Sequence, residues 1–261
     1  MARRDLSGSG VMRLTLSSAA APGATLAELL AAAARRGFAA VELVDGHAHG
    51  VHRGLTAPAV ADIARTAAEA GAPIVAFRTG DVALPGLESL ARLAAALDAP
   101  IVASGPAVSQ DDWAALAAPR FTDAGADLLL ETDGSEAEVL RAKRLAAGQG
   151  GVIGVAWEID PATAGLDGTA SVLAVADGLI RHIRLRGGGP ESMAQAGQGI
   201  GTLMSALALN GYNGPLALAP STDRYRLAWS AWLGRRGGWG CGAKEHEREL
   251  ATLSSRDGEE A

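Results

Sequence analysis

The fold is decided by residues 25–44, which read TLAELLAAAARRGFAAVELV. Thr25 and Glu28 have the spacing of a capping box, and the leucines and alanines after them recur every three or four residues, as on one face of a helix. Gly37 is typical of the residue that ends a helix, and the short apolar run over residues 39–44 is typical of a buried strand. The stretch therefore predicts a helix followed directly by a strand.

The same alternation of strand and helix recurs along the chain. Short apolar runs predict eight strands, at residues 11–16, 39–44, 73–77, 100–104, 127–131, 152–157, 180–185 and 215–218. Amphipathic patterns between these runs predict the helices. The helix that begins at Ser109 is the least regular, because Pro119 should break it. Strands that alternate with helices in this way indicate a parallel sheet.

Eight such units in about 220 residues match the size of an α/β protein of the (β/α)8 TIM barrel type, in a single domain. An open, doubly wound sheet is the alternative. It fits less well, because residues 17–20 read SSAA where a dinucleotide-binding fold has a Gly-x-Gly-x-x-Gly turn. We expect the barrel to span residues 11–233, with a flexible tail at residues 1–10 and a charged, glycine-rich tail at residues 234–261.

The composition bounds the kind of protein. Of the 261 residues, 48% are hydrophobic and 20% are charged, which is enough to bury a large core. Acidic residues outnumber basic ones by 29 to 23, which argues against a nucleic-acid partner held through its phosphates. The single cysteine, Cys241, cannot form an internal disulfide, so we expect a reduced, cytoplasmic protein.

The sequence also argues against a membrane partner. The longest uncharged stretch, residues 192–222, is interrupted by glycines and by a turn, so no apolar run of about 20 residues can span a bilayer. The basic residues at positions 3 and 4 are followed by an aspartate and glycines rather than by an apolar region, so we expect no signal peptide.

Polar side chains gather where the predicted strands end, and chemistry in a (β/α)8 barrel takes place at those ends. A carboxylate that follows an apolar run is costly to bury without a partner, so Glu131 indicates a site. The candidate site residues are Glu42, His47, His49, Arg78, Glu131, Trp157, Glu158, Asp160, His182, Arg184 and Arg186.

Several features of these strand ends have two interpretations. His182, Arg184 and Arg186 alternate, so they share one side of their strand, and we expect the barrel interior because the other side packs on apolar helices. Glu158 and Asp160 also share one side, and one of them is enough to serve a site. The His47-x-His49 pair could chelate a metal, although loop histidines without acidic co-ligands are more often surface residues. The glycine-rich residues 187–190 and 197–199 could hold a phosphate or form plain loops.

Four segments together resemble the xylose-isomerase-like barrels, which include sugar-phosphate isomerases and epimerases. They are the helix that begins with TL at residues 25–26 and leads into GFAAVEL at 37–43, LLLE at 128–131, GQG at 197–199 and GYNGPL at 211–216. The resemblance covers residues 11–222. It implies a TIM barrel enzyme that holds one divalent metal between Glu, Asp, His and Glu on its fifth, sixth, seventh and eighth strands.

This sequence departs from that ligand set at two of the four positions. Glu131 matches the first ligand, and Glu158 or Asp160 matches the second, but Arg184 and Ala219 stand in the third and fourth positions. An arginine stays protonated and only donates hydrogen bonds, so it would repel a cation and bind a carboxylate, a phosphate or an enolate. We therefore expect no metal cofactor. A divalent Mn, Mg or Zn ion is expected only if the alignment of the last two strands is wrong.

Three hypotheses follow. The first is a metal-independent isomerase, epimerase or lyase that acts next to the carbonyl of a small anionic, sugar-like substrate. The second is a metal-dependent sugar isomerase that takes replacement ligands from the histidine loop at residues 47–52 or from Asp160. The third is a non-catalytic barrel that binds a ligand or a partner protein. In the first, the proton-transferring residues are Glu131, His182, Glu158 and Asp160, and the substrate-binding residues are Arg184, Arg186, Glu42, His47, His49, Arg78 and Trp157.

The partners follow from the same hypotheses. We expect a small-molecule substrate, no nucleic acid and no membrane, and a homodimer is compatible with the sequence. A nuclease with this fold would need a dense set of His, Asp and Glu ligands and a basic groove, and the sequence shows neither.

Overall fold

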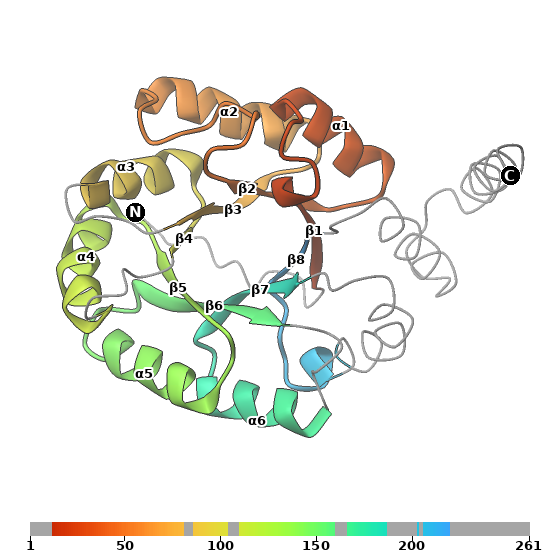
Figure 1. The fold of residues 1–261 in the computed structure, drawn as a ribbon. Helices are drawn as coiled ribbons and strands as arrows, with labels where there is room; N and C mark the ends of the chain where they lie inside the picture. Colours follow the sequence, from red (N-terminus) through yellow and green to blue (C-terminus); the bar gives the residue numbers. More distant parts are fainter. Residues whose placement is uncertain are drawn as a thin grey trace, which may run out of the picture.

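A computed structural model of the chain describes residues 12–80, 86–103, 110–159, 166–186, 203 and 206–219. Eight parallel strands close into one barrel, in which each strand pairs with its neighbours in sequence and the last pairs with the first (Figure 1). The strands are β1 (Arg13–Ser17), β2 (Ala40–Val44), β3 (Ile74–Thr79), β4 (Ile101–Ala103), β5 (Leu128–Thr132), β6 (Ile153–Ile159), β7 (Ile180–Arg186) and β8 (Pro215–Ala219). The predicted single-domain (β/α)8 barrel is confirmed.

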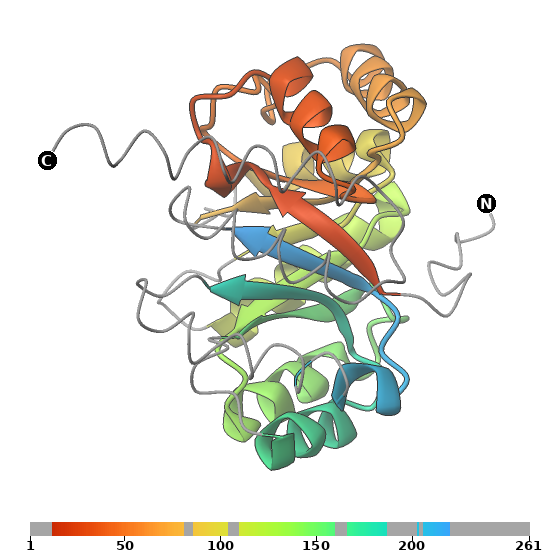
Figure 2. The ribbon, with the colours of Figure 1, turned by 90° about the vertical axis from the view of Figure 1, so that its right-hand side faces the viewer.

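Helices surround the barrel and follow the strands in turn. They are the short 3-10 helix η1 (Ser18–Ala20) and the α-helices α1 (Leu26–Arg35), α2 (Ala57–Glu69), α3 (Leu87–Leu97), α4 (Gln110–Ala124), α5 (Glu136–Ala146) and α6 (Leu166–Ala176). Figure 2 shows that all the strands run towards the same end of the barrel, with helices on either side. Among the described residues, we find no helix with the length and apolar character needed to cross a membrane.

The stretch that predicted the fold forms the expected elements. Thr25 and Glu28 cap α1 reciprocally: the Thr25 hydroxyl accepts from the Glu28 backbone, and the Glu28 carboxylate accepts from the Thr25 backbone. Gly37 then adopts a φ of 71°, a left-handed conformation that suits glycine and turns the chain into β2.

Helix α4 differs from the prediction, because it continues through Pro119 instead of breaking there. A proline inside a helix loses one backbone hydrogen bond and costs about 3 kcal/mol. On either side of it, Trp113 and Phe121 are buried, and so are Ala114, Ala117 and Ala118. Burying two such aromatic side chains contributes about 2 to 3 kcal/mol each, which outweighs the cost of the proline. The packing of α4 on the barrel therefore decides its length.

The strands send alternate side chains to two different cores. Large residues such as Phe77, Ile101 and Leu128 pack outwards against the helices. Inside the barrel, the strands β3 to β6 contribute a small apolar cluster made of Ala76, Val102, Leu129 and Ala156. Polar side chains on other strands, among them Glu42, His182 and Arg184, also point into the interior, and they form the candidate site.

Candidate functional site

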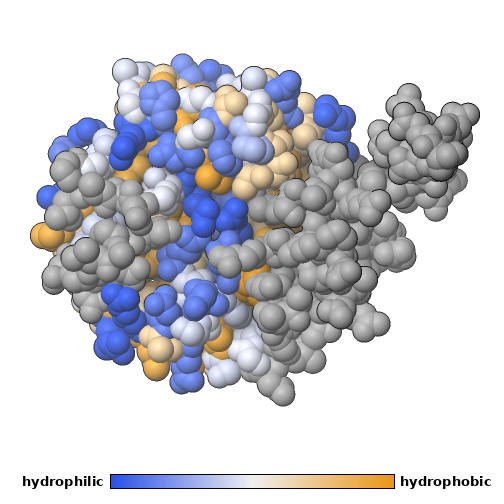
Figure 3. Space-filling model, viewed as in Figure 1, coloured by the Kyte–Doolittle hydropathy of each residue, from blue (hydrophilic) through white to orange (hydrophobic). Residues whose placement is uncertain are grey.

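The candidate site lies inside the barrel, towards the end at which the strands terminate. Two contacts join strands that are not neighbours, so they must cross the interior: Glu42 on β2 contacts His182 on β7, and Arg78 on β3 contacts Glu131 on β5. Figure 3 shows this end of the molecule, where hydrophilic side chains gather at the centre of the face. The polar residues predicted from the strand ends are therefore brought together here.

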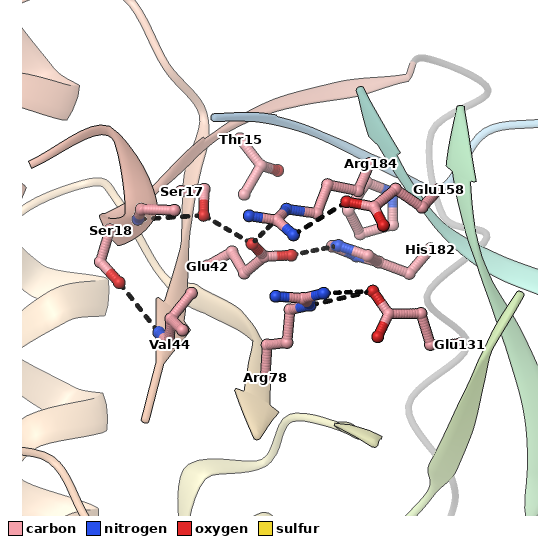
Figure 4. A network of polar contacts seen from close by, with 12 residues as sticks. Thr15, Ser17, Ser18, Glu42, Val44, Arg78, Glu131, Glu158, His182 and Arg184 are labelled. Atoms are coloured by element: carbon pink, nitrogen blue, oxygen red, sulfur yellow. Dashed lines mark hydrogen bonds and ion pairs between the residues drawn. The ribbon is translucent and has the colours of Figure 1, made fainter. Parts of the chain in front are cut away.

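Glu42 is the centre of the larger group of contacts (Figure 4). Its side chain is completely buried. Ser17 donates a hydrogen bond to Oε1 over 2.6 Å, and Nε2 of His182 donates to Oε2 over 2.6 Å. Nε of Arg184 lies 3.5 Å from Oε1. We call these four residues, Ser17, Glu42, His182 and Arg184, the Glu42 network.

The surroundings of Glu42 keep it ionised. Burial by itself raises the pKa of a carboxyl group, because it disfavours the charged form. Here the hydrogen bond and the charge of His182, the charge of Arg184 and the hydrogen bond from Ser17 together outweigh burial, and they lower the pKa of Glu42 from 4.5 to about 2. Glu42 is therefore a fixed negative charge inside the barrel at neutral pH.

His182 is held in one orientation by Glu42. A carboxylate only accepts hydrogen bonds, so Nε2 of His182 carries the proton that is shared with Glu42. The other ring nitrogen, Nδ1, is buried and has no hydrogen-bond partner within the described part of the chain. The side chain is only 1% exposed, so this structure buries His182 below the mouth rather than presenting it there.

Arg184 extends from the network to the mouth of the barrel. Its Nη1 donates a hydrogen bond to Oε1 of Glu158 over 3.1 Å, and both of these side chains are 12% exposed. The register of β7 places Arg184 opposite Glu158 on β6 and opposite Ala217 on β8. The predicted interior direction of Arg184 is therefore what the structure shows, and the guanidinium lies between the carboxylates of Glu42 and Glu158.

Arg78 and Glu131 form a second ion pair on the other side of the mouth. Nε of Arg78 donates to Oε1 of Glu131 over 3.1 Å, and Nη2 contacts the same oxygen. The side chain of Arg78 is 24% exposed and that of Glu131 is 14% exposed. We call these two residues the Glu131 pair. Unlike Glu42, Glu131 has a side chain that is partly exposed.

The loop that follows β2 uses its histidines in different ways. Nδ1 of His49 accepts from the Val51 backbone over 3.1 Å, so Nε2 is the protonated nitrogen, and it lies 2.8 Å from the Val44 carbonyl. Both nitrogens of His49 are therefore engaged in shaping the loop, and the structure does not present His47-x-His49 as a chelating pair.

His47 borders the site. Its Nδ1 lies 2.9 Å from the hydroxyl of Ser18, and that hydroxyl also accepts from the Val44 backbone. Burial lowers the pKa of His47, the nearby charge of Arg184 lowers it further, and a backbone hydrogen bond at Ser18 opposes both effects. The imidazole therefore lies close enough to Arg184 to feel its charge.

Trp157 does not join the site. It precedes the interior residue Glu158 on β6, so its side chain points the other way, into the apolar layer beneath α5 and α6. A Cβ added at Gly134 would lie 1.8 Å from Nε1 of the Trp157 indole, which shows how closely the loop after β5 covers this ring. The predicted contact of Trp157 with substrate is replaced by a packing role, because strand alternation sends adjacent residues to opposite faces.

Other predicted features fall outside the described residues. They are Asp160, the side chain of Arg186 and the glycine-rich residues 187–190 and 197–199. The sequence reasoning missed Ser17, which directly binds Glu42. The signal was present, because Ser17 ends the first strand at the same level as Glu42 in the second.

The residues described here do not fit a divalent metal. Within that part of the chain, no three or more His, Cys, Asp or Glu side chains are grouped so that they could hold an ion. Each interior carboxylate faces a cationic side chain instead: Glu131 faces Arg78, and both Glu42 and Glu158 face Arg184. A metal at this place would have to displace these ion pairs and sit beside a permanent positive charge.

Solved structures share this fold. An uncharacterised protein from Parabacteroides distasonis matches with a TM-score of 0.67 and 12% identity, over 87% of this chain and 99% of that one. The 3-keto-D-glucoside 4-epimerase from E. coli matches with a TM-score of 0.60 and 13% identity, over 85% and 99%. A xylose isomerase domain protein from Planctomyces limnophilus matches with a TM-score of 0.55 and 15% identity, over 86% and 94%.

At these identities the likeness shows the fold, and it confirms at that level the expected resemblance to the xylose-isomerase-like barrels. No family model matches the sequence, and no curated protein matches it. The chemistry of this chain therefore has to be argued from its own residues.

Proposed function

We propose that this chain is an isomerase or epimerase that acts next to the carbonyl of a small anionic, hydroxylated substrate and needs no metal. The observation that carries the proposal is the place of Arg184, whose guanidinium reaches the mouth of the barrel between two carboxylates. In the family that the sequence resembles, the same position of the seventh strand holds a metal ligand. A fixed positive charge thus stands where a metal site would be.

Arg184 would stabilise the negative charge of the reaction. Removing a proton from the carbon next to a carbonyl leaves an enolate, whose oxygen carries the charge. A preorganised guanidinium donates charge-assisted hydrogen bonds to such an oxygen, and it does so without the reorganisation that water requires. Glu42 holds Arg184 from the buried side, so the guanidinium is already oriented before the substrate arrives.

Glu131 is the proton-transferring base in this proposal. Its side chain is 14% exposed, whereas that of His182 is 1% exposed, so of these two groups Glu131 is the more accessible to a substrate. The carboxylate takes the proton, and the electron pair of the C–H bond moves into the enolate. Return of a proton to the opposite face of the same carbon gives an epimer. Return to the former carbonyl carbon, with the hydroxyl proton passing to the other oxygen, gives an isomer. His182 and Glu42 then act as positioning residues for Arg184.

The test is proton exchange with solvent. The whole protein is incubated in D2O with a panel of small hydroxy acids, oxo acids, aldoses, ketoses and their phosphates, and loss of the C–H signal next to the carbonyl is followed by proton NMR. We expect exchange with at least one compound. Glu131→Gln and Arg184→Ala should each slow it by at least about 100-fold. The matched control is Glu88→Gln, which breaks the exposed ion pair with Arg92 and should change nothing.

Three outcomes would contradict the proposal. Wild-type exchange in either site variant would remove the assigned residues. Exchange that stops with a chelator and returns with Mn²⁺ would favour the metal-dependent hypothesis. Binding of a compound without any exchange would favour a non-catalytic barrel.

A further inference from the structure

Arg184 lies next to the carboxylates of Glu42 and Glu158, and these two differ in how easily they can move away from the guanidinium. Glu42 is fully buried and is also bound by Ser17 and His182, so its departure would strand several buried polar groups. Glu158 is partly exposed at the mouth, where solvent can replace the contacts that it gives up. Figure 4 shows the guanidinium between the two carboxylates. Glu42 is therefore the permanent partner of Arg184, and Glu158 is the exchangeable one.

The donors of Arg184 limit where an anion can bind. A guanidinium has five N–H donors in one plane. Nε faces Glu42, and one donor of Nη1 is given to Glu158. An anion that enters from the mouth meets Nη1 and Nη2, and Nη1 already donates to Glu158. Two carboxylates at these nitrogens would repel each other, so the incoming anion and Glu158 compete.

We propose that Glu158 occupies the place of a substrate carboxylate and is released from Arg184 when the substrate binds. The inference rests on the proposed function and deepens it, because it names a carboxylate as the group that Arg184 recognises. A carboxylate has the charge and the planar shape of the group that it displaces. A phosphate would bring up to two charges into a mouth that already contains Glu42, Glu131 and Glu158 beside two arginines.

The release gives Glu158 a role in the reaction. While it is bound to Arg184, its charge is neutralised by the guanidinium. Once the substrate takes its place, its carboxylate no longer contacts the guanidinium and lies beside the bound molecule. It then offers a second proton acceptor in addition to Glu131, on a different strand of the same mouth.

The experiment measures anion binding to the whole protein by isothermal titration calorimetry, with pyruvate as the carboxylate probe and inorganic phosphate as the comparison. Glu158→Gln removes the competing charge and keeps the size of the side chain. We expect it to bind pyruvate about tenfold more tightly than the wild type, the size of effect that one charge-assisted hydrogen bond produces. Arg184→Ala should lose pyruvate binding, and Glu88→Gln should bind as the wild type does. Phosphate should bind more weakly than pyruvate to the wild type and to Glu158→Gln.

Pyruvate binding to Glu158→Gln that is no tighter than to the wild type, or that is undetectable, would overturn the competition. Phosphate that gains as much as pyruvate would overturn the choice of a carboxylate. If circular dichroism shows that Glu158→Gln does not fold, Glu158→Ala tests the same competition. In the wild type, pyruvate should also shift the NMR signal of the Arg184 Nε–H group.

These results are independent of the proton-exchange experiment. Tighter binding in Glu158→Gln without any exchange would leave the competition standing and remove the proposed reaction. Proton exchange in the wild type, together with no tighter pyruvate binding in Glu158→Gln, would support the proposed reaction and remove the competition.

Discussion

Glu42 and Glu131 are carboxylates on interior positions of the same barrel, and each is paired with a cationic side chain, but the two are held in opposite ways. Glu42 is completely buried and is contacted by Ser17, His182 and Arg184. Glu131 is partly exposed, and so is its partner Arg78. The difference separates two tasks. The Glu42 network fixes the geometry of the site, and the Glu131 pair stays within reach of whatever enters the mouth.

The first way to break this comparison is to remove each carboxylate in turn. Glu42→Ala would take the carboxylate partner away from the buried His182 and from Nε of Arg184, so we expect it to lower the free energy of unfolding by about 3 to 5 kcal/mol. Glu131→Ala leaves only a partly exposed arginine, so the expected loss is about 1 kcal/mol or less. Urea unfolding, followed by fluorescence and circular dichroism together, measures both values. Equal losses would mean that the two carboxylates are not held differently.

Low pH should also distinguish the two carboxylates, because protonation of Glu42 removes its contribution to stability. The pKa of Glu42 is lowered in the folded protein from 4.5 to about 2, so its contribution to stability is complete above about pH 5 and is lost as the pH falls towards 2. A shift of that size corresponds to about 3 kcal/mol. We expect Glu42→Gln to flatten the stability curve between pH 5 and 2 relative to the wild type, as measured by urea unfolding at each pH.

Glu131→Gln is the matched control for the acid experiment. It should keep the acid dependence of the wild type, because Glu42 is still present in it. If Glu42→Gln still loses stability between pH 5 and 2 as the wild type does, other carboxyl groups cause that loss.

The sequence predicted which residues lie in the Glu42 network and the Glu131 pair better than it predicted which of them contact one another. Short apolar runs placed Glu42, Arg78 and Glu131 at or next to the right strand ends, because such a run is a local property of the sequence. It could not pair Glu42 with His182, which lies 140 residues away and meets it only when the barrel closes. Long-range closure, and not local pattern, selects the partners.

The errors have the same origin. Pro119 marks a local break, but the burial of Trp113 and Phe121 along the barrel keeps helix α4 continuous. Trp157 is a candidate at a strand end, but it stands next to the interior residue Glu158, and neighbouring residues of a strand face opposite ways. The role of His49 could not be seen either, because its two partners are backbone groups, one at the end of β2 and one in the loop that follows.

A smaller change tests how much of the Glu42 network rests on one hydroxyl group. Ser17→Ala removes a 2.6 Å hydrogen bond to a buried carboxylate, which should cost about 2 kcal/mol in the free energy of unfolding. The comparable change at the edge of the mouth is Thr79→Val, which removes a 3.2 Å hydrogen bond to Asp45. We expect about 1 kcal/mol there, measured by the same urea experiment. A larger loss at Thr79 than at Ser17 would contradict the greater rigidity of the Glu42 network.

The smallest expected effect is that of metal removal. A metal held at a hundred times its dissociation constant would stabilise the folded chain by about 2.7 kcal/mol, and a chelator would remove that gain. To bind here, the ion would have to take Glu131 from Arg78 and Glu158 from Arg184, and it would then sit beside two freed positive charges. We therefore expect the melting temperature to be the same with a chelator and with excess Mn²⁺, Mg²⁺ or Zn²⁺. A metal-dependent rise that disappears in Glu131→Gln would show that the Glu131 pair opens to admit an ion, and the exposed half of the site would then be a metal centre.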